Sequence, residues 1–168
     1  MVLEFMLGLV YTFGYAGVFL ASLIGSASIL LPVPSFIFTF LAGKILDPFL
    51  VGVFSGIGSA IGELTSYGVG FGVVYGKNKL SKKRKPGSHN RKWSDMAKKW
   101  FRGRYGFVLL IVFAATPLPD DVLGLYCGVI RYDIKKYFIA VLIGKIILGI
   151  FLAYAGFYGL SFVSHYFF

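Results

Sequence analysis

Four charged side chains lie inside apolar segments of this sequence: Glu63, Asp120, Asp121 and Lys145. A charged group in the middle of a membrane span costs about 2.5 to 3.5 kcal/mol on insertion scales, so each should face a partner or a cavity. Two adjacent carboxylates in a site of low dielectric constant do not ionise together easily, which favours proton exchange at Asp120 and Asp121. We therefore predict a transport or proton site formed by Glu63, Asp120 and Asp121.

Each charged residue also has a structural interpretation. Glu63 could hydrogen-bond the backbone of a neighbouring hairpin, and one of the two aspartates could cap the half-helix that begins near Val122. Lys145 could be a counter-ion to Glu63 or to an aspartate, or it could extend along its helix to the cytoplasmic surface. The sequence favours this extension, because Lys145 lies only ten residues after Lys135.

Proline pairs interrupt two of the apolar segments in the same way. A twelve-residue pattern, P-x-P followed by a run that ends in glycine, occurs over residues 32–43 and again over 117–128. Proline lacks an amide hydrogen and fixes φ, so these breaks free carbonyl groups that lipid cannot satisfy. The breaks are at Pro32, Pro34, Pro117 and Pro119, and the polar residues beside them are Ser35 and Thr116. Such repeated breaks point to a transporter-like site built from half-helices.

The composition is that of a membrane protein with several membrane segments. The sequence is 57% hydrophobic and 18% aromatic, with a mean hydropathy of +0.77. Its apolar stretches are each long enough to cross a hydrocarbon core of about 30 Å. They cover residues 5–24, 26–46, 49–76, 105–130 and 137–163. We predict a single membrane domain over residues 1–168, with residues 1–24 as its first span.

The positions of basic residues test whether the proline-broken segments cross the membrane. Five full crossings would place four basic residues outside: Lys44, Arg131, Lys135 and Lys136. If residues 22–46 and 106–130 are re-entrant hairpins, only Lys44 remains outside, which agrees better with the positive-inside rule. The sequence thus predicts an all-α integral membrane protein with three full spans plus two inverted re-entrant helical hairpins.

A strongly basic loop separates the two halves. Of the 17 Lys and Arg residues, 12 lie within residues 77–104, where Asp95 is the only acid. A topology signal is favoured over a specific lipid-headgroup or nucleic-acid site, which puts this loop in the cytoplasm of a prokaryotic cell. Bulky and basic residues alternate at helical spacing over residues 93–104. This spacing predicts an amphipathic helix on the membrane surface.

Small residues recur at every fourth position between the two halves. One stripe consists of Gly58, Gly62, Ser66 and Gly70, and another of Gly68, Gly72 and Gly76. Small side chains at this spacing let helices approach closely, so most of these glycines are interpreted as packing positions.

Residues 14–156 resemble the DedA family, also called the VTT-domain or SNARE-associated Golgi family. The most specific match is the stretch from Gly58 to Glu63, followed by Tyr67 and Gly70, which is similar to the family's G-x-x-x-G-acid-x-x-x-Y-x-x-G pattern. Both hairpins also match, since each runs from P-x-P to a small residue and glycine, here Ala42-Gly43 and Cys127-Gly128.

The resemblance implies two opposed re-entrant hairpins and a role in moving lipids between leaflets. Bacterial members are linked to the recycling of undecaprenyl phosphate and other phospholipids, and eukaryotic relatives scramble phospholipids. The chain departs from the family pattern at two points. Ser35 and Phe36 replace the acid of the first hairpin, and Asp120 replaces the arginine of the second. Asp121 resembles the aspartate of a shorter branch of the family.

The function predicted from these features is transport of a phospholipid or polyprenyl phosphate, coupled to protons, as a flippase or scramblase. The alternative is a small-cation or multidrug exporter, because three carboxylates without an arginine suit a cation. No intramembrane phosphotransferase or aspartyl protease pattern occurs, so we expect no enzyme and no cofactor. We expect no metal site either, since the histidines, His89 and His165, are far apart. The predicted partners are membrane lipids, without nucleic acid, and a homo-oligomer is compatible with the sequence.

Overall fold

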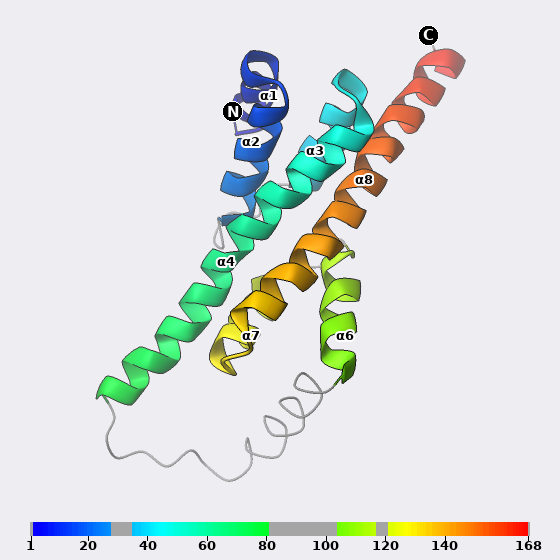
Figure 1. Cartoon of the computed structure of the whole chain (residues 1–168). Helices are drawn as coiled ribbons and strands as arrows, with labels where there is room; N and C mark the ends of the chain where they lie inside the picture. The colour runs from blue at the N-terminus through cyan, green and yellow to red at the C-terminus, as the bar shows by residue number, and fades with distance from the viewer. Residues whose placement is uncertain (1, 28–34, 81–103, 117–120, 168) are drawn as a thin grey trace.

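Two long helices form the centre of the protein. A computed structural model describes residues 2–27, 35–80, 104–116 and 121–167, and all its regular elements within these ranges are helices. Helices α4 (Pro48–Leu80) and α8 (Ile134–Phe167) lie against each other, as Figure 1 shows. Both are long and apolar enough to cross a membrane, over Pro48–Val74 and Ile134–Gly159. The all-α prediction is confirmed for the described residues.

An aspartate immediately precedes the first residue of each long helix. The carboxylate of Asp47 accepts a hydrogen bond from the amide of Leu50 at 3.0 Å. The carboxylate of Asp133 accepts two, from the amides of Lys135 at 2.9 Å and Lys136 at 3.0 Å. These side chains satisfy amides in the first turn that have no partner within the helix. The same capping device therefore fixes where both long helices start.

Four short helices flank the long pair. They are α2 (Tyr15–Ala27), α3 (Ser35–Ile45), α6 (Arg104–Ala114) and α7 (Asp121–Val129). At about 1.5 Å per residue they are roughly 14 to 20 Å long, so none crosses a hydrocarbon core of about 30 Å. They occupy the positions predicted for the arms of the two hairpins. The first arm begins at Tyr15, however, seven residues before the predicted start of the hairpin at Ser22.

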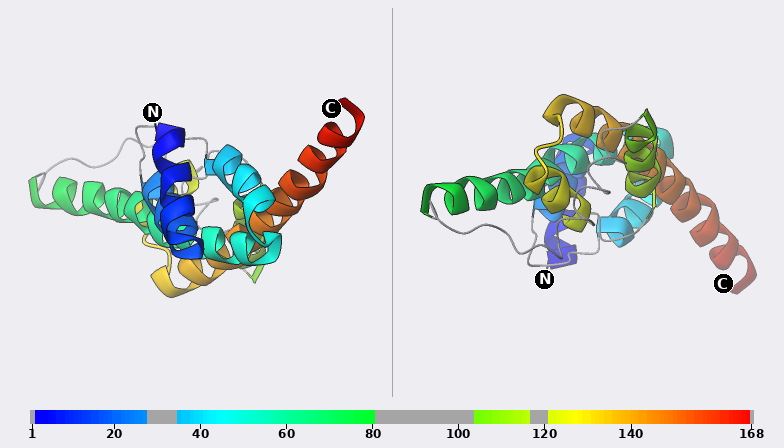
Figure 2. Two further views of the ribbon diagram at one scale, coloured as in Figure 1. Left: turned by 90° about the horizontal axis from the view of Figure 1, so that it is seen from above. Right: turned by 90° about the horizontal axis from the view of Figure 1, so that it is seen from below.

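The short helices contact the long pair in a twofold pattern, which can be followed in Figures 1 and 2. Helix α2 lies on α4 and α3 lies on α8, whereas α6 lies on α8 and α7 lies on α4. Each proline-containing segment thus joins one arm on α4 to one arm on α8. Exchanging the two halves of the chain exchanges these four contacts with one another.

The final glycines of the repeated pattern make equivalent contacts in this arrangement. Gly43 of α3 lies against the backbone of Ala153 in α8, and Gly128 of α7 lies against the backbone of Tyr67 in α4. A side chain at either glycine would collide with that backbone. The glycine that closes each pattern is therefore needed for contact with the opposite half of the chain.

The prediction that residues 1–24 form one uninterrupted span is wrong. Helix α1 (Val2–Phe13) ends before Gly14, whose φ is 56°, in the left-handed region, and α2 starts at Tyr15. The amide of Gly14 still donates to the carbonyl of Val10 at 2.8 Å, as in a glycine-terminated helix end. The chain then turns back, so that Gly17 lies against the carbonyl of Leu9. Two of the described helices, α4 and α8, are long and apolar enough to cross a membrane.

The first small-residue stripe of α4 contacts the short helices. Gly58 and Gly62 lie against backbone carbonyls of α2, at Phe19 and Leu23, and Gly70 lies against α7. The second stripe has no such contact. A side chain added at Gly68, Gly72 or Gly76 would meet no other atom within 4 Å. Only the first stripe is thus a packing face between the described helices.

Helix α4 contacts α8 through glycines that lie outside both stripes. Gly52 lies against Ile150, and Gly56 lies one turn further along against Ile146. The partner numbers fall as those of α4 rise, so the helices are antiparallel. Gly149 of α8 completes the contact, against the carbonyl of Gly52.

Some sequence predictions concern residues outside the described ranges. They are the proline breaks at Pro32, Pro34, Pro117 and Pro119, the carboxylate of Asp120, and nearly all of the basic loop with its amphipathic helix. These stay predictions.

We predict that Gly56→Ala lowers the thermal unfolding temperature of the purified protein in detergent. A methyl group at this position would lie 2.7 Å from backbone atoms of Ile146, and overpacking of this kind costs about 1 to 3 kcal/mol. The matched control is Gly72→Ala on the open stripe of the same helix, where alanine is tolerated or slightly stabilising. Equal unfolding temperatures for the two variants would contradict the described α4–α8 contact.

The cap of α8 should make stability depend on pH. The backbone amide of Lys136 lowers the pKa of Asp133 from its ordinary value of 3.8, and the amide of Lys135 and the charges of both lysines act in the same direction, against the opposing effect of desolvation. Because the pKa is lower in the folded state, the stabilisation is present above the unfolded pKa. It is lost as the pH falls through the folded pKa.

We therefore expect the difference in unfolding temperature between wild type and Asp133→Ala to shrink between pH 6 and pH 3. Asp133→Asn is the control, because an amide caps a helix at both pH values. A difference that stays constant over this interval would contradict the ionised cap.

Candidate functional site

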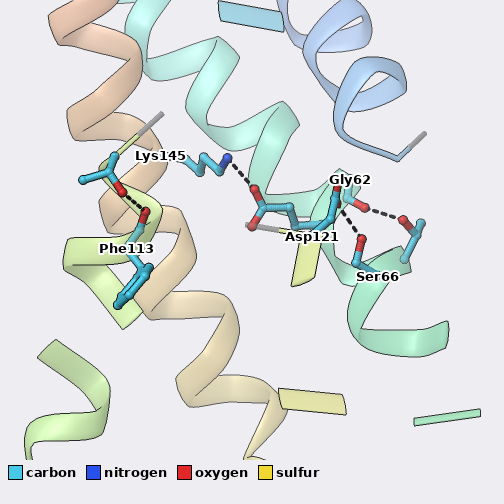
Figure 3. A network of polar contacts seen from close by, with 8 residues as sticks. Gly62, Ser66, Phe113, Asp121 and Lys145 are labelled. Atoms are coloured by element: carbon cyan, nitrogen blue, oxygen red, sulfur yellow. Dashed lines mark hydrogen bonds and ion pairs between the residues drawn. The ribbon is translucent and has the colours of Figure 1, made fainter. Parts of the chain in front are cut away.

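A buried ion pair joins the two long helices. The Lys145 ammonium of α8 lies 2.5 Å from the Oε1 atom of Glu63 in α4. Glu63 is 2% exposed and Lys145 is 7% exposed, so both charges are removed from solvent. Figure 3 shows Lys145 extending from its helix toward α4, with a dashed line marking the ion pair.

The pair lies near the middle of both candidate spans, Pro48–Val74 and Ile134–Gly159. The interpretation that Lys145 extends to the cytoplasmic surface is wrong. Lys145 is buried and lies beside Glu63 as its counter-ion. The physical reason is the α4–α8 crossing, which places a carboxylate within reach of the ammonium. A short buried bond to an opposite charge is favoured over a long extension through apolar surroundings.

A second polar contact lies one helical turn further along α4. The hydroxyl of Ser66 donates a hydrogen bond to Oδ1 of Asp121 at 2.8 Å, and Figure 3 shows both side chains. Ser66 is buried, and Asp121 is the half-buried first residue of α7. Ser66 was interpreted from the sequence only as a packing residue. Its spacing of three residues from Glu63 was the available signal that both lie on one face of a helix.

The inner ends of other short helices reach the same region. The hydroxyl of Thr65 donates to the carbonyl of Ala27, the last residue of α2, at 3.3 Å, and to that of Gly62 at 2.7 Å. The ring of Phe36, at the start of α3, lies with its centre 6.0 Å from the Lys145 ammonium, within cation–π range. Ends of α2, α3 and α7 therefore gather around Glu63 and Lys145.

The remaining predicted polar residues contribute less to this region. Thr116 bonds within its own helix end, donating to the carbonyl of Phe113 at 2.7 Å. Of Ser35 only the backbone is described, as the first residue of α3. The structure therefore brings together Glu63, Asp121 and Lys145 from the predicted set, together with Ser66, Thr65 and Phe36.

A tyrosine anchors the junction between α7 and α8 to α4. The hydroxyl of Tyr67 donates to the carbonyl of Tyr132 at 2.6 Å, and its ring lies 5.2 Å from that of Tyr137. The guanidinium of Arg131 also lies over the ring of Phe71, 5.6 Å from its centre. Tyr67 follows Glu63 by four residues, so one face of α4 holds both the ion pair and this anchor.

No group of three or more His, Cys, Asp or Glu side chains suited to a metal ion occurs within residues 2–27, 35–80, 104–116 and 121–167. The polar groups that the described residues contribute to the site are two carboxylates, one ammonium and two hydroxyl groups. This set can exchange protons and bind a charged group inside an apolar layer.

The long helices, the half-length arms and the charged site at mid-span define the class. This is an α-helical membrane protein of the transporter-like type, in which ends of short helices meet at a polar site. The model of the VTT domain matches residues 33–158, and the chain belongs to this family, which is also known as the DedA family.

The chain is also similar to an uncharacterized protein of Methanocaldococcus jannaschii. The two are 33% identical over 146 residues, which cover 86% of this chain and 84% of the relative. No solved structure matches the chain.

We predict strong energetic coupling between Glu63 and Lys145. Glu63→Gln or Lys145→Gln alone leaves the other charge buried without its ion partner, which typically costs about 3 to 5 kcal/mol. The double variant leaves no unpaired charge, so it should lose much less stability than the sum of the single variants. Unfolding by heat or by a denaturing detergent measures the three values, with Lys44→Gln on the exposed end of α3 as control. Additive effects would contradict the coupling.

Proposed function

We propose that this protein moves a lipid across the membrane, from one leaflet to the other, and that proton exchange at Glu63 and Asp121 accompanies the movement. The observation that carries the proposal is the buried Glu63–Lys145 pair at mid-span, surrounded by the inner ends of α2, α3 and α7. A static scaffold has no need of two charges in this position. Replacing a buried ion pair by apolar residues is often neutral or stabilising.

The contact pattern supports alternating access to this site. In each half of the chain, the first hairpin arm lies on that half's own long helix and the second arm lies on the long helix of the other half. Such exchange-related contacts allow two equivalent arrangements, one open to each side, which is how transporters with inverted repeats work. The glycines at the contacts, among them Gly43 and Gly128, permit close approach of backbones that could slide or rock.

In this proposal the carboxylates have separate tasks. Glu63 takes up a proton from one side of the membrane and releases it to the other beside Lys145, and Asp121 does the same beside Ser66, whose hydroxyl donates a hydrogen bond to it. The adjacent Asp120 belongs to the same predicted proton site. The partners are membrane lipids, and the basic loop over residues 77–104 lies on the cytoplasmic side.

The alternative, a small-cation exporter, has less support. It was based on three carboxylates without a nearby arginine, but Lys145 lies beside Glu63 and neutralises it. A substrate cation would have to compete with an ammonium that is already in place. An anionic headgroup competes with Glu63 for Lys145 only while Glu63 is ionised, so uptake of a proton by Glu63 would remove this competitor.

The test uses purified protein in liposomes that contain a labelled phospholipid or polyprenyl phosphate. Access of the label to a membrane-impermeant quencher is followed with and without a pH gradient. Protein-dependent exposure supports lipid movement, and acceleration by the gradient supports proton coupling. Absence of exposure with either lipid, in folded protein, would contradict the proposal.

We expect Asp121→Asn to abolish or shift the pH dependence of transport while the protein stays folded. The amide oxygen of asparagine can still accept the hydrogen bond of Ser66, but it cannot take up a proton. Glu63→Gln should likewise remove stimulation by the gradient. Asp47→Asn is the matched control, since it removes a carboxylate outside the site and keeps the cap of α4. Unchanged pH dependence in Asp121→Asn would remove this residue from the mechanism.

A further inference from the structure

We infer that Ser22 of α2 binds water on the path by which protons reach Glu63 from the side of the membrane on which α4 begins. This inference rests on the proposed function, and it adds to that function a residue and a route. The ligand is water, and the group that binds it is the hydroxyl of Ser22.

The hydroxyl of Ser22 is buried without a partner. Ser22 is 0% exposed, and its Oγ atom has no hydrogen-bond partner among the residues that the structure describes. A buried polar group that stays unpaired lowers stability. In native proteins such a group is normally satisfied by an ordered water or has a functional role.

Other hydroxyl groups in the described helices are satisfied locally. A serine or threonine of a helix can donate to a carbonyl three or four residues earlier in the chain. The residues that form this bond are Thr12, Ser55, Thr65 and Thr116. The hydroxyl of Ser22 does not form it, and neither does that of Ser66, which donates to Asp121 instead. Ser22 thus resembles a site residue more than a packing residue.

Equivalent glycines of the two long helices allow Ser22 to be compared with the second half of the chain. Gly58 of α4 and Gly144 of α8 each follow the capping aspartate of their helix, Asp47 or Asp133, by eleven residues. Each of these glycines lies against the first arm of its own half. Positions of α2 can therefore be matched with positions of α6.

This match pairs Ser22 with Ala114. In the first half, the glycine lies against the carbonyl of Phe19, three residues before Ser22. In the second half, it lies against the carbonyl of Ile111, three residues before Ala114. Ala114 is buried as well, at 1% exposed. Because alanine fills the corresponding place on α6, packing does not require the hydroxyl of Ser22.

Ser22 lies at the depth of Glu63. The next residue, Leu23, lies against both Gly58 and Gly62, and Glu63 directly follows Gly62. Side chains of a helix tilt toward its N-terminus, so the carboxylate of Glu63 lies beside this segment of α4. The hydroxyl and the carboxylate are therefore at similar depth in the membrane.

Helix α2 connects this depth with one end of α4. Its first residue, Tyr15, accepts a hydrogen bond from the amide of Asp47, directly before α4, at 3.4 Å. The charged groups around Glu63 come from other helices, Lys145 from α8 and Asp121 from α7, and α2 has no charged residue. A hydroxyl donates one hydrogen bond and accepts two, so Ser22 can hold a water and pass a proton on without becoming charged.

The first test measures access of water to this position. Ser22→Cys is made in a Cys127→Ala background, which removes the single cysteine of the chain. The purified full-length protein in liposomes is treated with a small water-soluble methanethiosulfonate, and labelling is read by mass spectrometry. Ser22→Cys should be labelled. Ala114→Cys in the same background is the matched control and should remain unlabelled, as should Cys127→Ala alone.

The second test separates the hydroxyl from packing. Ser22→Ala should unfold at the same temperature as wild type or at a higher one, because it removes an unpaired buried group. In liposomes it should keep lipid movement without a gradient and lose the acceleration by a pH gradient. Ser55→Ala is the control, since this buried hydroxyl bonds the carbonyl of Gly52 in its own helix, and it should keep the acceleration.

Three results would overturn the inference: no labelling of Ser22→Cys, full acceleration in Ser22→Ala, or a lower unfolding temperature of Ser22→Ala, which would indicate a structural hydrogen bond. Lipid movement by wild type combined with any of them would leave the proposed function standing and remove Ser22 from it. Labelling of Ser22→Cys without lipid movement by wild type would leave the water site standing and contradict the proposed function.

Discussion

The ion pair between Glu63 and Lys145 constrains the rest of the structure. Each charge is acceptable at mid-span only because the other lies 2.5 Å away, and this holds for one register of α4 against α8. A shift by a single helical turn, about 5.4 Å, would separate the two charges. The glycines at the crossing, Gly52, Gly56 and Gly149, let the backbones approach closely enough for the pair to form. Close packing and charge pairing therefore require the same register.

The hairpin arms follow from that register. Once α4 and α8 cross, glycines on each long helix allow close contact with the arms. Gly58 and Gly70 of α4 lie against α2 and α7, and Gly144 and Gly156 of α8 lie against α6 and α3. Helices α2 and α7 lie on α4, while α3 and α6 lie on α8. The arms are too short to cross the membrane, so their inner ends and unsatisfied backbone groups lie at mid-depth. The hydroxyl of Thr65 satisfies one such group, the carbonyl of Ala27. Ends of the half-length helices α2, α3 and α7 thus bring polar groups to the region of the charged pair.

Much of this architecture could be predicted from the sequence, because proline and glycine act locally. The repeated P-x-P pattern placed both arms of the second hairpin within a few residues, and the stripe of Gly58, Gly62 and Gly70 marked a contact face. The first span was predicted wrongly because hydropathy does not distinguish one long helix from two that reverse at Gly14. Glu63 was one of the partners considered for Lys145, but the sequence did not favour it, since the pairing depends on the register of α4 against α8. Sequence spacing within one helix carries no information about that register.

The position of the positive charge bears on mechanism. Lys145 lies on a long helix and not on a hairpin, whereas Asp121 begins the second arm of a hairpin. A movement of α7 along α4 would therefore alter the Ser66–Asp121 contact and leave the Glu63–Lys145 pair in place. A movement of α4 against α8 would alter the Glu63–Lys145 pair and leave the Ser66–Asp121 contact in place. The two polar contacts thus respond to two different motions, the sliding of a hairpin arm and the rocking of the two halves. In transporters built from inverted repeats, access alternates largely by rocking or gating of one part against the other around a fixed site.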